Sequence, residues 1–404
     1  MGLRGAKGVL GKAAASRPRR SRAVGPVTVI LTNPRGVRYR CMTVRRVRHA
    51  EDALARALLE RYLAVRRGDA VTIETWSHGL RWARALVVEA RRIGARPTIR
   101  VEDEEAFFRS LATLGLAGAA PGRTPDVGRR GLRIELGGPE AFPRLLGLPA
   151  GDLARFGPRL TRARGTAGAR AVRLAVADAT PTAAARYGVD ATAWEAELVR
   201  ASLVDPRRLE AIGRRLARRL ARARRVRVRH PNGTDLEVER VPRPPIVEAG
   251  RPGVRGAAPA GRVPAGLLVV ALRKGRASGT WEANRPAYDR YTVPPVAVGG
   301  RFEFRAGRLT GFAFDRGGEA FAALYRPAAH GPGRPVALTV GLNPAIAHAP
   351  ELPELALGTV GLVLGTSSLR PGGSPSGGIR LPVLTGADVH VDGRPWLVRG
   401  APVT

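Results

Sequence analysis

The sequence has few of the residues that would announce a class of protein. Its only cysteine is Cys41, so the chain forms no internal disulfide and no cysteine-based zinc or iron–sulfur site. This favours a reducing compartment, and we expect a cytoplasmic location. No apolar run reaches the about 18 residues that a membrane-spanning helix needs, so we expect no membrane partner.

The common nucleotide and hydrolase motifs are also missing. The sequence has no G-x-x-x-x-G-K-[ST] loop, no G-x-G-x-x-G after a strand, no H-E-x-x-H and no G-x-S-x-G. None of the 6 histidines pairs with another at a ligand spacing. The sequence therefore indicates no dinucleotide site and no familiar zinc or serine hydrolase site.

Acidic residues are scarce relative to basic ones. Lys+Arg is 68 against 33 Asp+Glu, a net charge of +35, and arginine supplies almost all of the basic residues. One interpretation is attraction to an anion, with RNA, DNA or a membrane surface as the candidates. The other is arginine-rich usage from a GC-rich genome, spread over solvated faces. The stretch Pro206–Arg225 poses the same alternatives, because its predicted helix has arginines on one face and leucines on another.

The first part of the chain lacks periodic apolar residues. Residues 1–41 hold ten Lys/Arg and no acid, and we predict a disordered basic tail over 1–47. A second interpretation is that translation begins at Met42, just before the first predicted helix.

From about residue 48, helical and strand patterns alternate. Apolar spacing predicts strands at 70–74, 97–101, 132–136 and 172–176, and helices at 51–65, 79–93, 103–114, 153–160, 190–201 and 206–225. We expect Ser77 to cap the second helix. This rhythm predicts a parallel sheet, so residues 48–225 form an N-terminal α/β domain in this interpretation.

The pattern changes near Val226. Short strands and Gly/Pro turns dominate from there, with one predicted helix at 318–324. We predict a mixed, largely antiparallel α+β domain over residues 226–404.

Eight short segments occur in this second part in a distinctive order. They are 232–236 (NGTDL), 263–266 (VPAG), 278–280 (SGT), 302–309 (FEFRAGRL), 341–344 (GLNP), 358–360 (GTV), 371–373 (PGG) and 391–393 (VDG). Taken together, the chain from about Glu51 to Gly400 resembles the thermophilic metalloaminopeptidase family that includes aminopeptidase T and aminopeptidase S. The resemblance implies a two-domain, dimeric exopeptidase whose C-terminal domain would use two divalent metals such as Zn or Co to activate a water.

The positions that the resemblance assigns to metal ligands carry other residues here. The P-x-G-E glutamate falls on Leu267, and the glutamate four residues before the glycine of G-x-N-P falls on Ala337. The histidine of G-T-x-H falls on Gly361. The histidine and aspartate of an H-x-D pair fall on Arg380 and Pro382. Four of the five have no side-chain donor, and arginine is a permanent cation.

We therefore expect that the chain keeps the fold of the family and lacks its dinuclear metal centre, with no metal, no cofactor and no catalytic residues at these positions. A binding or scaffold role would remain, with a peptide or a small anionic ligand as partner, and Arg380 as the anion-binding residue. One alternative is an active metal-dependent aminopeptidase with ligands recruited from elsewhere; the candidates are His330, His348, Glu351, Glu354 and His390. Another is an anion- or nucleic-acid-binding protein. His390-Val391-Asp392 also spells H-x-D, but the following glycine predicts a hairpin turn there.

Overall fold

The computed structural model describes residues 29–32, 38–41, 43–119, 131–141, 144, 170–252, 260–288, 296–318, 333–365 and 379–403. The chain divides into two compact units, residues 1–49 and 50–404. In the first unit, β1 (Val29–Thr32) and β2 (Arg38–Cys41) form an antiparallel hairpin. The sequence predicts a disordered tail here, because β2 reads Arg-Tyr-Arg-Cys and carries no apolar alternation. The rest of the predicted tail up to residue 42 lies outside the described residues.

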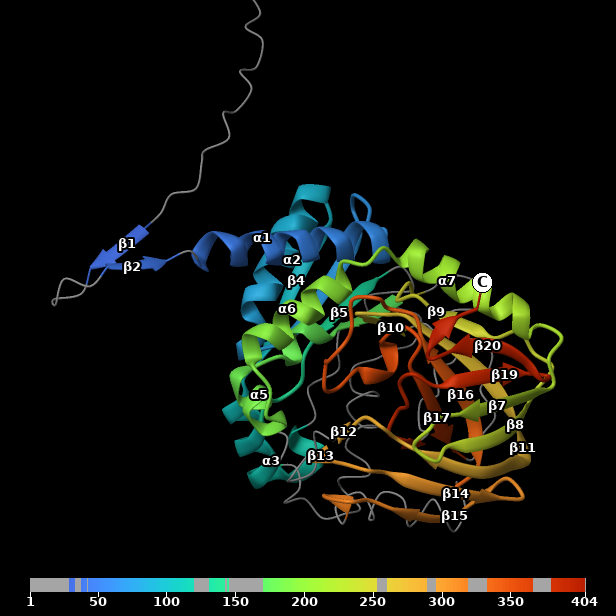
Figure 1. The fold of residues 1–404 in the computed structure, drawn as a ribbon. Helices are drawn as coiled ribbons and strands as arrows, with labels where there is room; N and C mark the ends of the chain where they lie inside the picture. The colour runs from blue at the N-terminus through green and yellow to red at the C-terminus, as the bar shows by residue number, and fades with distance from the viewer. Residues whose placement is uncertain are drawn as a thin grey trace, which may run out of the picture. The chain divides into compact units, whose positions relative to one another are not determined.

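The second unit contains a parallel sheet of five strands in the order β10-β6-β5-β3-β4. Its strands and connecting elements are shown in Figure 1. The strands are β3 (Ala70–Trp76), β4 (Arg96–Glu102), β5 (Leu132–Leu136), β6 (Arg170–Leu174) and β10 (Ala260–Val263). The helical elements are α1 (Thr43–Arg56), η1 (Ala57–Tyr62), η2 (Ser77–Gly79), α2 (Leu80–Ile93), α3 (Glu104–Ala119), η4 (Ala175–Asp178), α5 (Pro181–Tyr187), α6 (Ala191–Ser202) and α7 (Pro206–Leu220).

Apolar residues explain why these segments pair as they do. Every residue of β5 is buried except Glu135, which is intermediate, as expected for a central strand of a parallel sheet. The apolar stripe of α2, which includes Trp82, Leu86 and Ala90, is buried in the same core. Ser77 does not cap α2: it lies inside the short helix η2, and Gly79 occupies the N-cap position. The predicted capping is wrong because one tight 3₁₀ turn intervenes between strand and helix.

The second sheet is antiparallel and has 12 strands. Its main path is β18-β17-β16-β11-β8-β7-β19-β20-β21; off this path, β9 and β14 pair with β11, and β15 pairs with β14. The strands are β7 (Arg225–Arg229), β8 (Asp235–Arg240), β9 (Ile246–Glu248), β11 (Leu267–Glu282), β14 (Arg301–Arg305), β15 (Arg308–Ala313), β16 (Pro335–Gly341), β17 (Val360–Leu364), β18 (Ile379–Arg380), β19 (Asp388–Val391), β20 (Arg394–Val398) and β21 (Ala401–Pro402). A separate small ladder pairs β12 (Ala287–Tyr288) with β13 (Val296–Ala297).

These two sheets confirm the predicted fold class, an N-terminal parallel-sheet α/β part followed by a mixed α+β part. Strand β10 follows the predicted boundary at residue 226 and nevertheless pairs in parallel with β6, so the parallel sheet takes its edge strand from the later part of the chain. The predicted helices at 153–160 and 318–324 lie outside the described residues, apart from Gly318. None of the helices in the described part of the chain combines the length and hydrophobicity that a membrane span requires.

Candidate functional sites

Four of the five positions that the family resemblance assigns to metal ligands share one face of the antiparallel sheet. Ala337 lies opposite Val363, and Val363 lies opposite Arg380, so these residues form one cross-strand row. Gly361 lies two residues from Val363 on β17, and cross-strand neighbours and alternate residues point to the same side of a sheet. Leu267 pairs with Gly341, four residues beyond Ala337 on β16. The structure therefore groups Ala337, Gly361 and Arg380, and places Leu267 farther along the same face.

The space at these positions is filled. Leu267 and Ala337 are 1% and 0% exposed. A Cβ atom added to Gly361 would lie 2.5 Å from Thr339 Oγ1, and Thr339 is itself buried. Pro382 contributes its carbonyl oxygen, which accepts a hydrogen bond of 2.9 Å from Trp281 Nε1. A larger polar side chain would need its neighbours to move.

Arg380 is engaged by an acid of the same chain. Its guanidinium forms an ion pair with Glu354, and Arg262 forms a second one to the same carboxylate oxygen at 3.0 Å. Burial alone would raise the pKa of Glu354, but the positive charges of Arg380 and Arg262 outweigh it and hold that pKa below its ordinary value. Glu354, one of the alternative ligand candidates, thus lies between two cations, an arrangement that disfavours a metal ion.

Replacing Glu354 with glutamine should lower the free energy of unfolding by about 2 kcal/mol near pH 7. Removing one partner of a fully buried pair costs about 3–5 kcal/mol, and the exposure of Arg380, 39% for its side chain, reduces this. Because the folded-state pKa is depressed, the stabilisation is present above the unfolded-state pKa of about 4.3 and is lost as the pH falls through the lower folded value. Urea unfolding at a series of pH values should therefore show the wild-type advantage shrinking below about pH 4.

The matched control is Glu303→Gln on β14, whose side chain is 44% exposed and which should change stability by less than about 0.5 kcal/mol. Equal stabilities of Glu354→Gln and wild type across the pH range would contradict a structural role for the Arg262–Glu354–Arg380 triplet.

The other alternative ligands in the described part of the chain are not among the residues of this cross-strand row. Glu351 accepts a hydrogen bond of 2.5 Å from the Tyr187 hydroxyl, and His348 is exposed, with its backbone N–H donating to Glu197. His390 lies on β19, in the predicted hairpin with β20, and the Asp392-Gly393 turn has φ of 47° and 81°. This confirms the hairpin interpretation of His390-Val391-Asp392. His330 lies outside the described residues.

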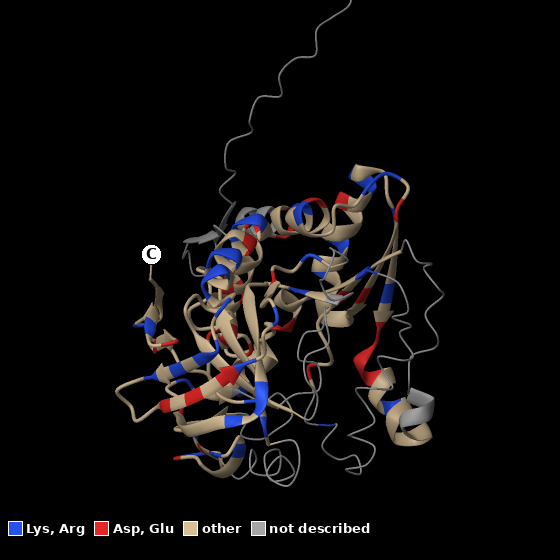
Figure 2. Cartoon of the chain, turned by 90° about the vertical axis from the view of Figure 1, so that its right-hand side faces the viewer, with Lys and Arg blue, Asp and Glu red and all other residues tan. Residues whose placement is uncertain are grey.

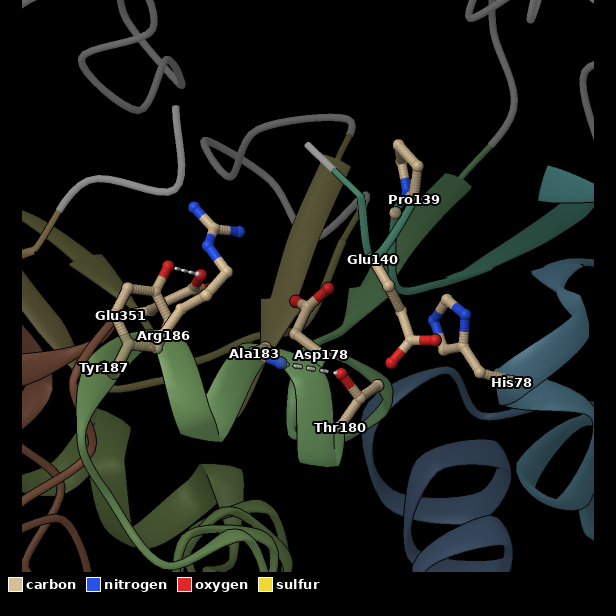
Figure 3. A pocket seen from close by; sticks show the side chains of 10 residues that line it. His78, Pro139, Glu140, Asp178, Thr180, Ala183, Arg186, Tyr187 and Glu351 are labelled. Carbon is tan, nitrogen blue, oxygen red and sulfur yellow. Dashed lines mark hydrogen bonds between the residues drawn. The ribbon is translucent and has the colours of Figure 1, made fainter. Parts of the chain in front are cut away.

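The parallel sheet provides a second candidate site, at the carboxyl ends of its strands. From β3 the chain crosses to β4 on one side, and then to β5 on the other side of β3, so the strand order reverses between β3 and β5. Ligands of open α/β sheets characteristically bind at such a switch point. A pocket of about 290 Å³, including space open to solvent, lies here (Figure 3). Its lining comes from the segments that follow β3, β5 and β6, from α5, and from Glu351.

Three side chains with metal-binding donors meet at this switch point. His78 follows β3, Glu104 begins α3 after β4, and Glu140 follows β5. One donor atom from each lies within 4.8 Å of the other two. Sequence reasoning missed this group, because no fixed spacing relates three residues on three separate connections. The available signal was a histidine or acid directly after each predicted parallel strand.

The arginine-rich face of α7 is exposed, which both the solvated-face and the anion-binding interpretations expect. Arg214, Arg215, Arg218 and Arg219 are exposed, while Leu209, Leu216 and Leu220 are buried. Arg214 pairs with Glu210 at 3.0 Å. Positive and negative side chains also face one another between β7 and β8, since arginines of β7 lie opposite acids of β8 (Figure 2).

Two solved structures share this two-sheet fold. Wild-type AmpT, the aminopeptidase T of Thermus thermophilus, matches 88% of this chain and 100% of its own, with a TM-score of 0.62 and 18% identity. The 2,5-dihydroxypyridine dioxygenase of Pseudomonas putida KT2440 matches 88% of this chain and 97% of its own, with a TM-score of 0.51 and 16% identity. No protein-family model and no curated protein matches the chain. At these identities the likeness establishes a distant aminopeptidase T-like fold.

Proposed function

We propose that this chain is an aminopeptidase T-like protein that has lost the dinuclear metal centre and the peptidase activity, and that retains a binding role. The observation that carries the proposal is the state of the assigned ligand positions on the antiparallel sheet. Leu267 and Ala337 are buried among apolar residues, and Gly361 has no room for a side chain beside Thr339. Arg380, with Arg262, brings positive charge to the same region.

The chemistry of amide hydrolysis explains why these changes matter. Two metals that activate a water need carboxylate or imidazole donors around them, and loss of an outer-shell partner alone costs about 10–100-fold in metal affinity or activity. Five replaced positions leave no inner coordination sphere. The ligand would be a peptide or a small anion, with Arg380 as the residue that attracts it. A homodimer remains a prediction from the family resemblance.

The test is hydrolysis of aminoacyl amides and short peptides by the untagged full-length protein. With Zn²⁺, Co²⁺ or Mn²⁺ added, the rate of N-terminal residue release should equal that of buffer, while an unrelated metal-dependent aminopeptidase assayed alongside is active. Chelator-sensitive release by this protein, together with two bound metals per chain, would support the active-enzyme alternative instead. Nucleic-acid binding whose affinity falls steeply with salt would favour the remaining alternative.

A further inference from the structure

We propose that His78, Glu104 and Glu140 form a binding site for one divalent transition-metal ion at the switch point of the parallel sheet. The inference concerns a different sheet from the five replaced positions, and it does not depend on the proposed function. It rests on the positions of the three side chains, on the contacts that hold them there and on the negative charge around them.

The donor atoms are close to the geometry that one ion requires. Metal–ligand bonds of about 2.0–2.2 Å and tetrahedral angles place the donors of one ion about 3.3–3.6 Å apart. The donor atoms here lie within 4.8 Å of one another, so side-chain adjustments of about an ångström bring all three into range. Figure 3 shows the Glu140 carboxylate next to the His78 imidazole at the edge of the pocket.

Backbone hydrogen bonds fix two of the donors relative to each other. One carboxylate oxygen of Glu104 accepts from the backbone N–H of Glu140 at 2.9 Å, and the other accepts from that of Ala141 at 2.7 Å. The start of α3 is thereby tied to the turn that carries Glu140. Each carboxylate oxygen has a second lone pair, so Glu104 retains acceptor capacity for a metal.

The chain around His78 leaves room for the imidazole. Gly137 has a φ of 68°, and a Cβ atom there would lie 3.2 Å from His78 Nε2 and 3.3 Å from the Ala177 carbonyl oxygen. Any other residue would crowd the imidazole and adopt a strained backbone conformation. The strand-end turn after β5 therefore passes close to the ring because it begins with glycine.

The local charge is opposite to that of the whole chain. The net charge is +35, yet four of the 33 acids occur consecutively as Glu102–Glu105, where β4 leads into α3. Figure 2 shows this acidic stretch at the strand–helix junction. Asp178 and Glu351 line the same pocket, together with Arg186, and Arg173 pairs with Asp178 at 2.8 Å, so the acids still outnumber the arginines here. A cation is the ligand that such a local field favours, against the overall charge of the protein.

The donor set also selects the kind of cation. One imidazole and two carboxylates suit Zn²⁺, Mn²⁺, Co²⁺ or Fe²⁺, whereas Mg²⁺ and Ca²⁺ take oxygen ligands and copper(I) prefers sulfur. Three protein ligands leave coordination positions for water or a small ligand from the pocket.

The proposal is tested by titrating Zn²⁺ into the untagged full-length protein after dialysis against EDTA and then metal-free buffer. Calorimetry should show one zinc bound per chain. His78→Ala and Glu140→Gln should each weaken binding by at least about 10-fold, the lower limit for loss of an outer-shell partner. With Co²⁺ as the probe, the visible absorption of the bound ion should disappear in His78→Ala.

Two controls separate coordination from general attraction. Glu105→Gln removes the same charge from the same acidic stretch, and His348→Ala removes an exposed imidazole elsewhere; each should bind Zn²⁺ within about twofold of wild type, since neither is a ligand. Thermal midpoints of the metal-free variants show whether each variant is folded. If His78→Ala is unfolded, the zinc affinity of Glu140→Gln tests the proposal instead.

Either of two results would overturn the proposal: no saturable zinc uptake by the wild type, or a loss of affinity in Glu105→Gln as large as in Glu140→Gln. A wrong proposed function would give a different result. The protein would then bind two metals per chain and hydrolyse peptides, and both properties would persist in His78→Ala.

Discussion

Replacing Asn343 with alanine should lower the free energy of unfolding by about 3–5 kcal/mol. The side chain is 0% exposed and makes three hydrogen bonds to the backbone. Its Nδ2 donates to the carbonyl oxygens of Ala201 at 3.0 Å and Ala265 at 2.8 Å, and its Oδ1 accepts from Ala345 N at 3.0 Å. Each bond contributes about 1 kcal/mol, and each buried group left without a partner adds about 1–3 kcal/mol.

The effect should be large because Asn343 connects three separate parts of the second unit. Ala201 lies in α6, Ala265 comes just before β11, and Ala345 follows β16. The neighbouring segment is held similarly, since one carboxylate oxygen of Glu197 on α6 accepts from the backbone N–H groups of residues 347–349 at 2.7–3.0 Å. The Gly341-Leu342-Asn343-Pro344 motif thus has a structural role that does not require a metal.

The matched control is Asn284→Ala. Asn284 also makes two side-chain hydrogen bonds to backbone atoms, with the Thr385 carbonyl oxygen at 2.7 Å and the Thr385 N–H at 2.8 Å, but it is exposed. Water can replace these bonds, so the cost should stay below about 1 kcal/mol. Urea unfolding monitored by far-UV circular dichroism measures both variants. If the two asparagine variants lose equal stability, burial of Asn343 is not what makes its bonds important.

The sequence predicted the long elements of the fold and missed the short ones. The parallel strands β3 to β6 were identifiable because each carries several apolar residues between helices with a regular stripe. Strands β9, β10, β12 and β13 have two to four residues each, too few for a period to be recognised. Strand β11 has two strand-like parts in the sequence, 267–272 and 279–282, with a polar stretch that contains Gly275 between them. In the structure the strand is continuous, with an irregularity between Leu272 and Ala277.

The two candidate sites differ in how far the sequence could locate them. The assigned ligand positions follow from a series of motifs in a fixed order, and the common face of Leu267, Ala337, Gly361 and Arg380 is a property of strand register that the sequence alone does not give. The His78 group is brought together entirely by topology. Only the strand order β5-β3-β4 places the three connections side by side.

Restoring the assigned donors should destabilise the protein instead of creating a metal centre. Leu267→Glu would put a carboxylate at a position that is 1% exposed and that pairs with the half-buried Glu248 on β9, so a buried negative charge would face a second one. Burial of a charge without a partner costs several kcal/mol, and we expect a loss of more than about 4 kcal/mol. The control Leu267→Met conserves volume and should cost less than about 1.5 kcal/mol.

Gly361→His should fail for a steric reason. Its Cβ atom would lie 2.5 Å from Thr339 Oγ1 and 3.5 Å from Val383 Cγ1, and Thr339 is 4% exposed, so its hydroxyl cannot swing out to solvent. Overpacking of this kind costs about 1–3 kcal/mol. The double variant Leu267→Glu/Gly361→His should therefore show a lower urea midpoint than either single variant and no metal-dependent release of N-terminal residues. A double variant that keeps wild-type stability and gains such activity would contradict this prediction, because it would show that the fold accepts a metal centre with only two of the five assigned donors restored.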